Sequence, residues 1–237
     1  MAREVIVKAN QIKHRSVFMR LAKISLLVIM LFLCSLYFTL GLVYKEGKFT
    51  VILGGDEEKE SGLAVFEDLK SARGKRKLEA QPIKKMDNIS YKWLPVDIDN
   101  YDGGSHNGDN YIAYTFYVEN QGTENLNYWY ELVIDGVIKD VDDAIRVRIY
   151  HNGTPTTYAK AKPTGEAETG TKTFIINPEM DIEGQSVVAV RRKNLYPDDI
   201  DKFTVVVWIE GDDPECLDNL IGGAIKMHMT ITEEPAE

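Results

Sequence analysis

Cysteine is scarce in this sequence, with two in 237 residues. Cys34 lies within an uncharged apolar run that is predicted below to span a membrane, and Cys216 lies far outside this span, so we expect the two thiols not to pair with each other. A disulfide framework is therefore excluded, and an extracellular domain must be stabilised by its own hydrophobic core. With 44% hydrophobic and 27% charged residues, the chain is able to bury such a core in one or two domains.

Sequence motifs for hydrolysis and for phosphate binding are missing as well. A zinc protease of the common kind carries two histidines at i, i+4 spacing with an adjacent glutamate. The four histidines of this chain, His14, His106, His151 and His228, stand alone. Neither a GxSxG nucleophile elbow nor a glycine-rich phosphate loop is present. We therefore expect a protein that is not an enzyme.

The two signs of charge are distributed unevenly along the chain. Six of the 28 Lys and Arg residues lie before residue 24, against one of the 37 Asp and Glu residues. The remainder is strongly acidic, and the formal net charge of the whole chain is -9. An acidic surface repels a phosphate backbone, so we expect no nucleic-acid partner.

A run of twenty uncharged residues, 24–43, separates the basic and acidic parts. At about 1.5 Å per residue, a helix of this length crosses the roughly 30 Å hydrocarbon layer of a bilayer. The basic tail 1–23 predicts a cytoplasmic N-terminus, with the rest of the chain outside the cell membrane. A cleaved signal peptide is the alternative, but such a peptide ends at a small-x-small site, whereas this run ends TLGLVYKEG. We expect a single-pass protein anchored in the lipid bilayer.

Residues 44–85 are predicted to form a membrane-proximal strand and a charged spacer. The alternation in KFTVIL indicates a strand at 48–53, which should pair within the following domain if the apolar run is retained. Beyond it, Leu63, Phe66 and Leu69 recur at helical spacing and indicate one short amphipathic helix.

Short period-two segments rich in Tyr, Val, Ile and Trp fill the extracellular domain predicted at 86–237. In one of them, Arg146 and Arg148 alternate with apolar residues, and the Asn152-Gly153 pair that follows indicates a type I′ hairpin. Strands are expected at 111–119, 126–134, 145–149, 156–160, 173–176, 186–190, 203–209 and 225–232. The predicted fold class is all-β: an antiparallel β-sandwich, jelly-roll or immunoglobulin-like, behind one N-terminal transmembrane helix.

One acidic loop, 97–110, is the best candidate for an ion site. Asp97, Asp99, Asp102 and Asp109 lie among glycines that allow tight turns, and calcium favours such hard oxygen ligands. The spacing does not match an EF-hand, and an ordinary loop of Asx-turns is the alternative interpretation. Two further acidic groups are interpreted as solvated loops: Asp198, Asp199 and Asp201, and Asp212, Asp213 and Glu215.

Two stretches of the sequence resemble the TasA and camelysin proteins of Gram-positive bacteria. One is 111–130, a strand, an Asn-Gln-Gly turn and a second strand; the other is 212–226, where an acidic loop leads into a glycine-containing final strand. The resemblance covers roughly residues 90–232. It implies a jelly-roll subunit of biofilm fibres or cell-surface coats, and some camelysins have been classed as metalloproteases.

The function expected from these features is that of a non-enzymatic, membrane-anchored cell-surface protein. Its extracellular β-sandwich would make structural or adhesive contacts with other copies of itself, other surface proteins or a wall polymer. Two alternatives stay open: a cleaved, secreted fibre subunit like TasA, and a surface hydrolase of the camelysin type.

Overall fold

The computed structural model describes residues 18–19, 21–37, 48–54, 62–71, 73–83, 85–177 and 179–234. The chain divides into two compact units, Met1–Lys45 and Glu46–Glu237. In the first unit, residues 21–37 are helical and their side chains are exposed. No helix among the described residues combines the length and the apolar character that crossing a membrane requires. The predicted span 24–43 includes residues 38–43, which lie outside the described part of the chain.

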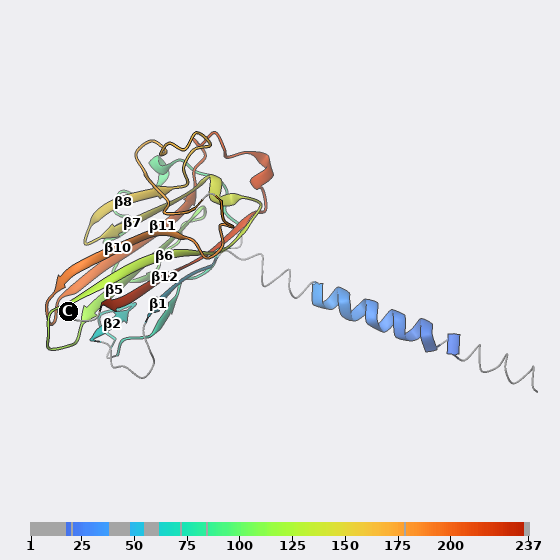
Figure 1. Ribbon diagram of the computed structural model, residues 1–237, viewed down its shortest axis with the longest axis horizontal. Coiled ribbons are helices and arrows are strands. Elements are labelled where there is room, and N and C mark those ends of the chain that lie inside the picture. Colours follow the sequence, from blue (N-terminus) through green and yellow to red (C-terminus); the bar gives the residue numbers. More distant parts are fainter. Residues whose placement is uncertain are drawn as a thin grey trace, which may run out of the picture. The chain divides into compact units, whose positions relative to one another are not determined.

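The second unit contains, within the described residues, a five-stranded and a seven-stranded sheet. The five-stranded sheet has the order β10 (Ser186–Leu195), β6 (Leu126–Ile138), β12 (Ala224–Glu234), β1 (Lys48–Leu53) and β3 (Lys77–Glu79). The seven-stranded sheet has the order β2 (Leu63–Phe66), β5 (Tyr111–Asn120), β11 (Ile200–Ile209), β7 (Ile145–His151), β8 (Thr154–Ala159) and β9 (Lys172–Thr173), with β4 (Gly104–Ser105) paired to β5. β12 lies between β6 and β1 (Figure 1).

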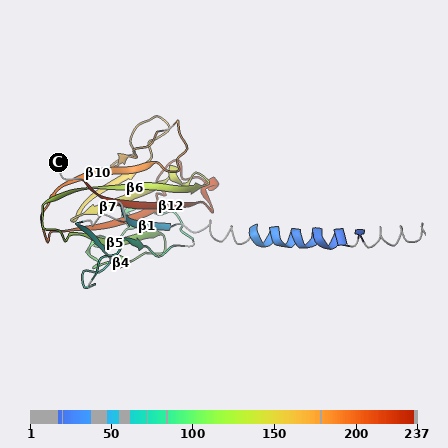
Figure 2. The ribbon, with the colours of Figure 1, turned by 60° about the horizontal axis from the view of Figure 1, so that its bottom comes forward.

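The two sheets pack face to face around one large hydrophobic core, so the prediction of a β-sandwich is confirmed at this level. Figure 2 shows β6 and β10 on one side of the sandwich and β4 and β5 on the other. The ring of Phe203 stacks on Phe116 at 5.2 Å and meets Tyr130 of the opposite sheet edge-on at 5.1 Å. Such aromatic pairs add to the free energy gained by removing apolar surface from water.

The predicted hairpin at Asn152-Gly153 joins β7 to β8. Both residues have positive φ, 50° for Asn152 and 77° for Gly153, as a type I′ turn requires. Because the turn is tight, it fixes the register of the two strands and therefore the face on which each β7 side chain lies.

The expectation of purely antiparallel sheets was wrong, because both sheets are mixed. β1 runs parallel to β12, with Phe49 opposite Met227, and β8 runs parallel to β9. A parallel pair cannot be closed by a short hairpin. β1 and β12 are the first and last strands of the domain in sequence, so the chain that connects them forms the rest of the sandwich.

The segment 44–85 contributes three strands to the sandwich, and the compact unit begins at Glu46 and not at residue 86. A strand, β2, occupies 63–66, where a short helix was predicted. All four of its residues are buried: Leu63 and Val65 face the main core, while Ala64 and Phe66 pack against Tyr117. Pairing with the edge of β5 therefore outweighs the helical spacing of the apolar residues.

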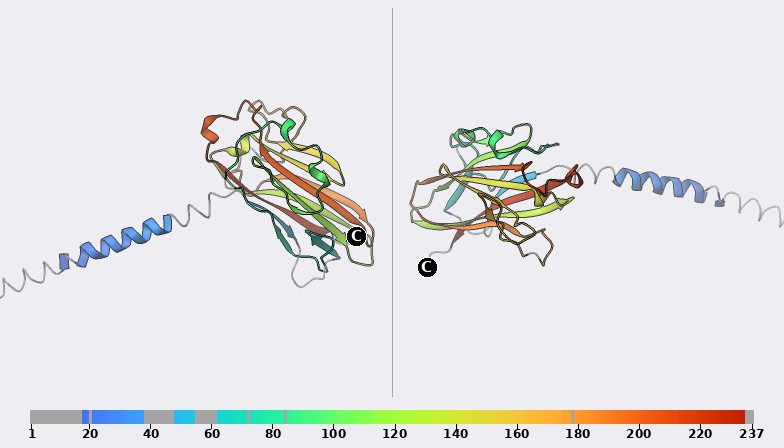
Figure 3. Two further views of the ribbon diagram at one scale, coloured as in Figure 1. Left: turned by 180° about the vertical axis from the view of Figure 1, so that it is seen from behind. Right: turned by 90° about the horizontal axis from the view of Figure 1, so that it is seen from above.

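Short 3-10 helices connect the strands, and two of them cover the outer face of the seven-stranded sheet. They are η1 (Tyr91–Trp93) and η2 (Ile98–Asn100), while η3 (Val141–Asp143) and η4 (Asp218–Leu220) lie in later loops. Figure 3 shows η1 and η2, in green, over the strands of this sheet. Beneath them is a second, smaller core made by Ile89, Leu94, Ile98, Ala113, Val206 and Trp208.

The role of β1 is tested by the substitution Phe49→Ala in the full chain in detergent. Phe49 is 1% exposed and its ring meets Tyr114 of the opposite sheet at 6.0 Å. We expect a loss of about 3–5 kcal/mol in the free energy of unfolding, measured by denaturation with tryptophan fluorescence.

The control is Lys48→Ala, which removes an exposed side chain one residue away on the same strand. We expect it to change the free energy by less than about 1 kcal/mol, because its ion pair with Glu79 is solvated. Equal effects of the two substitutions would contradict the place of β1 in the core.

Candidate functional site

A cleft of about 590 Å³ lies on the outer face of the seven-stranded sheet. Its side chains come from β7, β8, β11, η1 and two loops, and the residues that line it are Tyr91, Arg146, Arg148, Thr157, Lys162, Glu168, Thr169, Gly170, Thr171, Trp208, Glu210, Asp212, Asp213 and Pro214. The alternation of β7 places Arg146 and Arg148 on this outer face because Ile145, Val147 and Ile149 enter the core. The alternation of arginine and apolar residues was therefore a sequence signal for this surface.

A stacked pair, Arg148 on Trp208, forms one wall of the cleft. The guanidinium carbon of Arg148 lies 5.4 Å from the centre of the indole ring, and Arg148 Nε donates a hydrogen bond to Thr157 Oγ1 at 2.8 Å. The indole Nε1 of Trp208 donates to Glu210 Oε2 at 3.0 Å. Glu210 also accepts from the backbone amide of Tyr91 at 3.2 Å, which holds η1 at the edge of the cleft.

A buried ion pair also lines the cleft. Arg146 Nη2 donates to Asp213 Oδ2 and lies 3.7 Å from Glu168 Oε2. Both side chains of the Arg146–Asp213 pair are almost fully buried. Removing one partner of such a pair leaves an uncompensated charge in a site of low dielectric, which is strongly destabilising. We therefore interpret the Arg146–Asp213 pair as stabilising the cleft and not as binding a ligand.

The carboxylates of Glu168, Asp213 and Glu215 converge beside this pair, with ligand atoms within 4.8 Å of one another. Among the described residues, no other group of three His, Cys, Asp or Glu side chains converges in this way. Burial and the neighbouring charges of Asp143, Asp213 and Glu168 raise the pKa of Glu215. Asp213 was interpreted from the sequence as part of a solvated loop, but it is buried, and Glu168 was not identified because it is remote in sequence.

Asp201 is a second acidic residue that the structure places away from solvent, on the inner face of β11. It accepts hydrogen bonds from Tyr128 Oη at 2.6 Å, Asn152 Nδ2 at 2.7 Å and Arg192 Nε at 2.9 Å. His151 Nε2 is 3.3 Å from Asp201 Oδ2, at the outer limit of a hydrogen bond, and the geometry of that contact does not qualify as one. Since Tyr128 and Arg192 belong to the five-stranded sheet, Asp201 ties the two sheets together.

The hydrogen-bond donors around Asp201 decide its ionisation. Burial favours the neutral acid, but the contacts with His151, Tyr128, Asn152 and Arg192 outweigh it and hold the pKa of Asp201 well below its ordinary value. Asp201 is therefore a structural residue. Its neighbour Asp199 accepts a hydrogen bond from the backbone amide of Tyr196 at 3.1 Å, as expected of a loop residue.

The acidic loop predicted to hold calcium is organised by His106. The two ring nitrogens of His106 lie 3.1 Å from the carbonyl oxygen of Gly104 and 3.0 Å from that of Ile98, and the ring stacks on Tyr101 at 4.2 Å. Burial lowers the pKa of His106. Asp97, Asp102 and Asp109 are exposed and Asp99 is half-buried, so calcium binding by these four side chains stays a prediction.

The remaining histidines and the described cysteines are dispersed. His14 lies outside the described residues, and His228 Nδ1 is 2.7 Å from Asp135 Oδ1 on the polar face of β12. Cys216 is a free thiol whose sulfur accepts a hydrogen bond from Asn88 Nδ2 at 3.3 Å.

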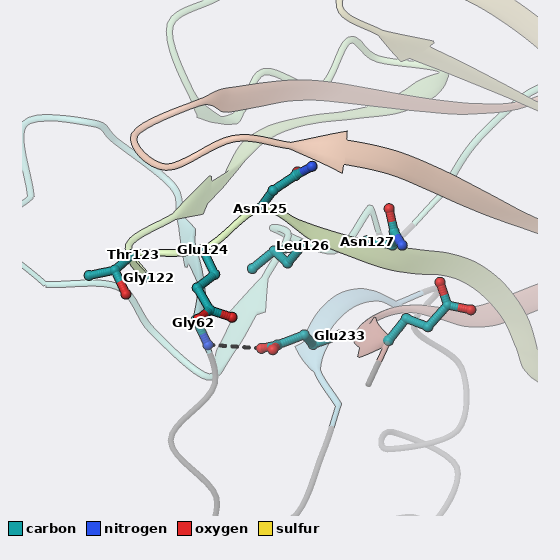
Figure 4. Close-up of a pocket in the computed structure, with 9 residues that line it drawn as sticks. Gly62, Gly122, Thr123, Glu124, Asn125, Leu126, Asn127 and Glu233 are labelled. Atoms are coloured by element: carbon teal, nitrogen blue, oxygen red, sulfur yellow. Dashed lines mark hydrogen bonds between the residues drawn. The ribbon is translucent and has the colours of Figure 1, made fainter. Parts of the chain in front are cut away.

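A second hollow, of about 150 Å³, lies at one end of the sandwich, beside the loop between β5 and β6. Figure 4 shows the carboxylate of Glu233 directed at the backbone amide of Gly62, which donates to it at 2.8 Å. The rest of the wall is formed by the loop residues Gly122 to Asn125, by Leu126 and Asn127 of β6, and by Glu234 of β12. This hollow is about a quarter of the size of the cleft, which is therefore the stronger candidate for a site.

Comparison with known proteins adds no relative: no family model and no curated protein matches this sequence. The geometry of the cleft is accordingly the basis for a functional interpretation.

The structural role of Asp201 predicts that Asp201→Asn destabilises the full chain in detergent by about 3–5 kcal/mol, since it removes one partner of a buried charged network. Denaturation followed by tryptophan fluorescence measures this loss. The matched control is Asp181→Asn, an exposed aspartate, for which we expect a change within about 0.5 kcal/mol.

The same network predicts a dependence of stability on pH. The folded pKa of Asp201 is lowered, so its contribution is fully present above the unfolded pKa of about 3.9 and is lost as pH falls toward the folded value. We expect the free energy of unfolding to fall more steeply between about pH 5 and pH 2 in the wild type than in Asp201→Asn. Parallel pH profiles would contradict this account.

The calcium prediction is tested by thermal melting of the full chain with millimolar calcium and with a chelator. A calcium ion held by the folded loop raises the melting temperature by mass action. The double variant Asp99→Asn with Asp102→Asn should abolish the calcium-dependent rise in melting temperature. The control Glu168→Gln, outside the loop, should preserve it. An unchanged melting temperature in the wild type would leave the loop with a structural role alone.

Proposed function

We propose that the protein is a non-enzymatic, membrane-anchored cell-surface protein whose β-sandwich makes adhesive contacts outside the cell through the cleft beside Trp208. The single observation that carries this proposal is the cleft itself. It is the larger of the two hollows described above, and its walls combine a stacked arginine–tryptophan pair with hydroxyl and charged groups. Binding sites combine a few placed polar groups with aromatic surface in this way.

The rigidity of its walls also supports a binding role for the cleft. Arg148 is held by Trp208 and Thr157, and η1 is held through Glu210 and the small core under Leu94. Groups already fixed in position lose little conformational entropy when a ligand binds. The cleft therefore needs little rearrangement to recognise a partner.

The anchoring part of the proposal rests on the sequence. The uncharged run 24–43 follows a basic tail, and residues 24–37 of it are helical, with exposed apolar side chains, in the structure. The basic tail would stay in the cytoplasm, and the acidic sandwich would face the outside.

The anchor predicts that the full-length chain stays in the membrane fraction after carbonate washing and migrates uncleaved near 26.8 kDa. Immunoblotting of cell fractions, with N-terminal sequencing of any product in the medium, measures this outcome. A released product that begins between residues 44 and 49 would overturn the anchor.

A cleaved, secreted fibre subunit is the second candidate, because β1 directly follows the apolar run. β1 is the first strand of the sandwich and pairs within its own sheet, between β12 and β3, which is the arrangement expected of a chain that retains the run. Cleavage near residue 44 would leave β1 close to a free N-terminus, where it could pair with the sheet of a neighbouring copy. Fibres of the released product in electron micrographs would support this candidate over the anchored one. The camelysin-type hydrolase is the third candidate.

A further inference from the structure

Two cations of the cleft lack a carboxylate partner in the described part of the chain. Arg146 is neutralised by Asp213 and Glu168, whereas Arg148 contacts only the neutral Thr157 and Trp208. Lys162 lines the same cleft, and no ion pair to a described carboxylate involves it. The Nη groups of Arg148 make no hydrogen bond to the described residues, so they remain available to an acceptor from outside.

The acidic residues of the cleft, by contrast, are already engaged by donors of the protein. Glu210 accepts from Trp208 and from backbone amides, and Asp212 accepts from Ser90 Oγ at 2.8 Å. Asp213 is paired with Arg146, and Glu168 lies 3.7 Å from the same guanidinium. Arg148 and Lys162 are therefore the charged groups left with free donors, although the lining holds four carboxylates against three cations and the chain as a whole has a net charge of -9.

Two exposed aromatic rings belong to η1, and one of them lines the cleft. Tyr91 lines the cleft and is 49% exposed, and Trp93, on the same short helix, is 74% exposed. Leu94, the next residue, is buried in the small core with Trp208, so the rings are held on a rigid element. Tyr and Trp offer large, rigid contact surfaces with a polar atom, which suits ligands that have both apolar and polar faces.

We propose that the cleft binds an acidic polysaccharide. The carboxylates of the polymer pair with the free Nη groups of Arg148 and with Lys162, in charge-assisted hydrogen bonds. The C–H faces of its sugar rings lie on Tyr91 and Trp93, and its hydroxyl groups meet the threonines of the cleft. This inference deepens the proposed function and rests on it, because it names the class of partner that the surface domain contacts.

The sugar rings distinguish this polymer from a nucleic acid. A nucleic acid carries one phosphate per nucleotide and is repelled by the acidic surface around the cleft. A polyuronate carries one carboxylate per sugar and meets the same repulsion, but each of its charges lies beside an exposed sugar ring whose C–H face and hydroxyl groups fit Tyr91 and the threonines of the cleft. We therefore expect binding that weakens with salt, with few ionic contacts.

The test uses the full chain in detergent and three soluble probes: polygalacturonate, which carries carboxylates, uncharged dextran, and a single-stranded oligonucleotide. We expect the wild type to bind polygalacturonate, with no measurable binding of the other two, in biolayer interferometry. Arg148→Gln with Lys162→Gln should weaken that binding at least about tenfold, as expected for the loss of charge-assisted hydrogen bonds.

Two further variants keep the test specific. Trp93→Ala removes an exposed ring and should weaken binding about fivefold or more without changing the melting temperature. Lys172→Gln removes an exposed lysine of β9, outside the cleft, and should leave the affinity unchanged. Equal binding of dextran or of the oligonucleotide, no binding of polygalacturonate, or an unchanged affinity in the double variant would each overturn the proposal.

A second readout separates this proposal from the proposed function. The wild type and the double variant are tested for binding to intact bacterial cells, before and after protease treatment of the cells. In one outcome, cell binding depends on Arg148 and Lys162 and is lost after protease treatment, while polygalacturonate does not bind. That outcome would overturn the polysaccharide proposal in favour of a protein partner, and the adhesive function would be retained. No cell binding by the wild type would overturn the adhesive function itself.

Discussion

The burial of β11 on both faces is the constraint on which the rest of the structure depends. A strand of a two-layer sandwich ordinarily exposes one face to water. In β11, Phe203, Val205 and Val207 enter the core between the sheets, while Val206 and Trp208 are covered by η1 and η2. The loops that carry η1 and η2 therefore have to cover the outer face of β11. The cleft lies where this covering layer ends, beside Trp208.

The polar groups at the two ends of β11 follow from the same burial. At one end Asp201 lies on the inner face, where it is charged only because donors from both sheets surround it. At the other end Glu210 accepts a hydrogen bond from the indole N–H of Trp208 and orders the loop that reaches η1. A buried polar group without such partners would cost free energy, so these contacts fix how the layers meet. Two cations of the cleft, Arg148 and Lys162, have no carboxylate partner among the described residues and remain free for recognition.

The sandwich also depends on contacts between the ends of the domain. β1 is the first strand and β12 the last, and their parallel pairing places Phe49, Val51 and Leu53 in the core. The strand that follows the apolar N-terminal run is therefore an integral part of the fold. An anchored chain holds this strand next to the membrane, whereas cleavage would leave it near a free end, and this difference separates the two leading candidates for function.

Local patterns were enough to predict most of the longer strands from the sequence. Alternation of apolar and polar residues located β5, β6, β7 and β12, a run of apolar residues located β11, and the need for positive φ located the turn at Asn152-Gly153. The same alternation placed Arg146 and Arg148 on the face away from the core. These features depend on residues that are close together in the sequence, so the sequence pattern is enough to predict them.

The tertiary structure alone decided which distant residues meet. The parallel pairing of β1 with β12, the strand at 63–66 and the inclusion of β1–β3 in the sandwich depend on partners far along the chain. Burial of Asp201, and the meeting of Glu168 with Asp213, are of the same kind. In the sequence such carboxylates look like those of any solvated loop, because their environment comes from side chains that only the packing of two sheets and their covering loops brings together.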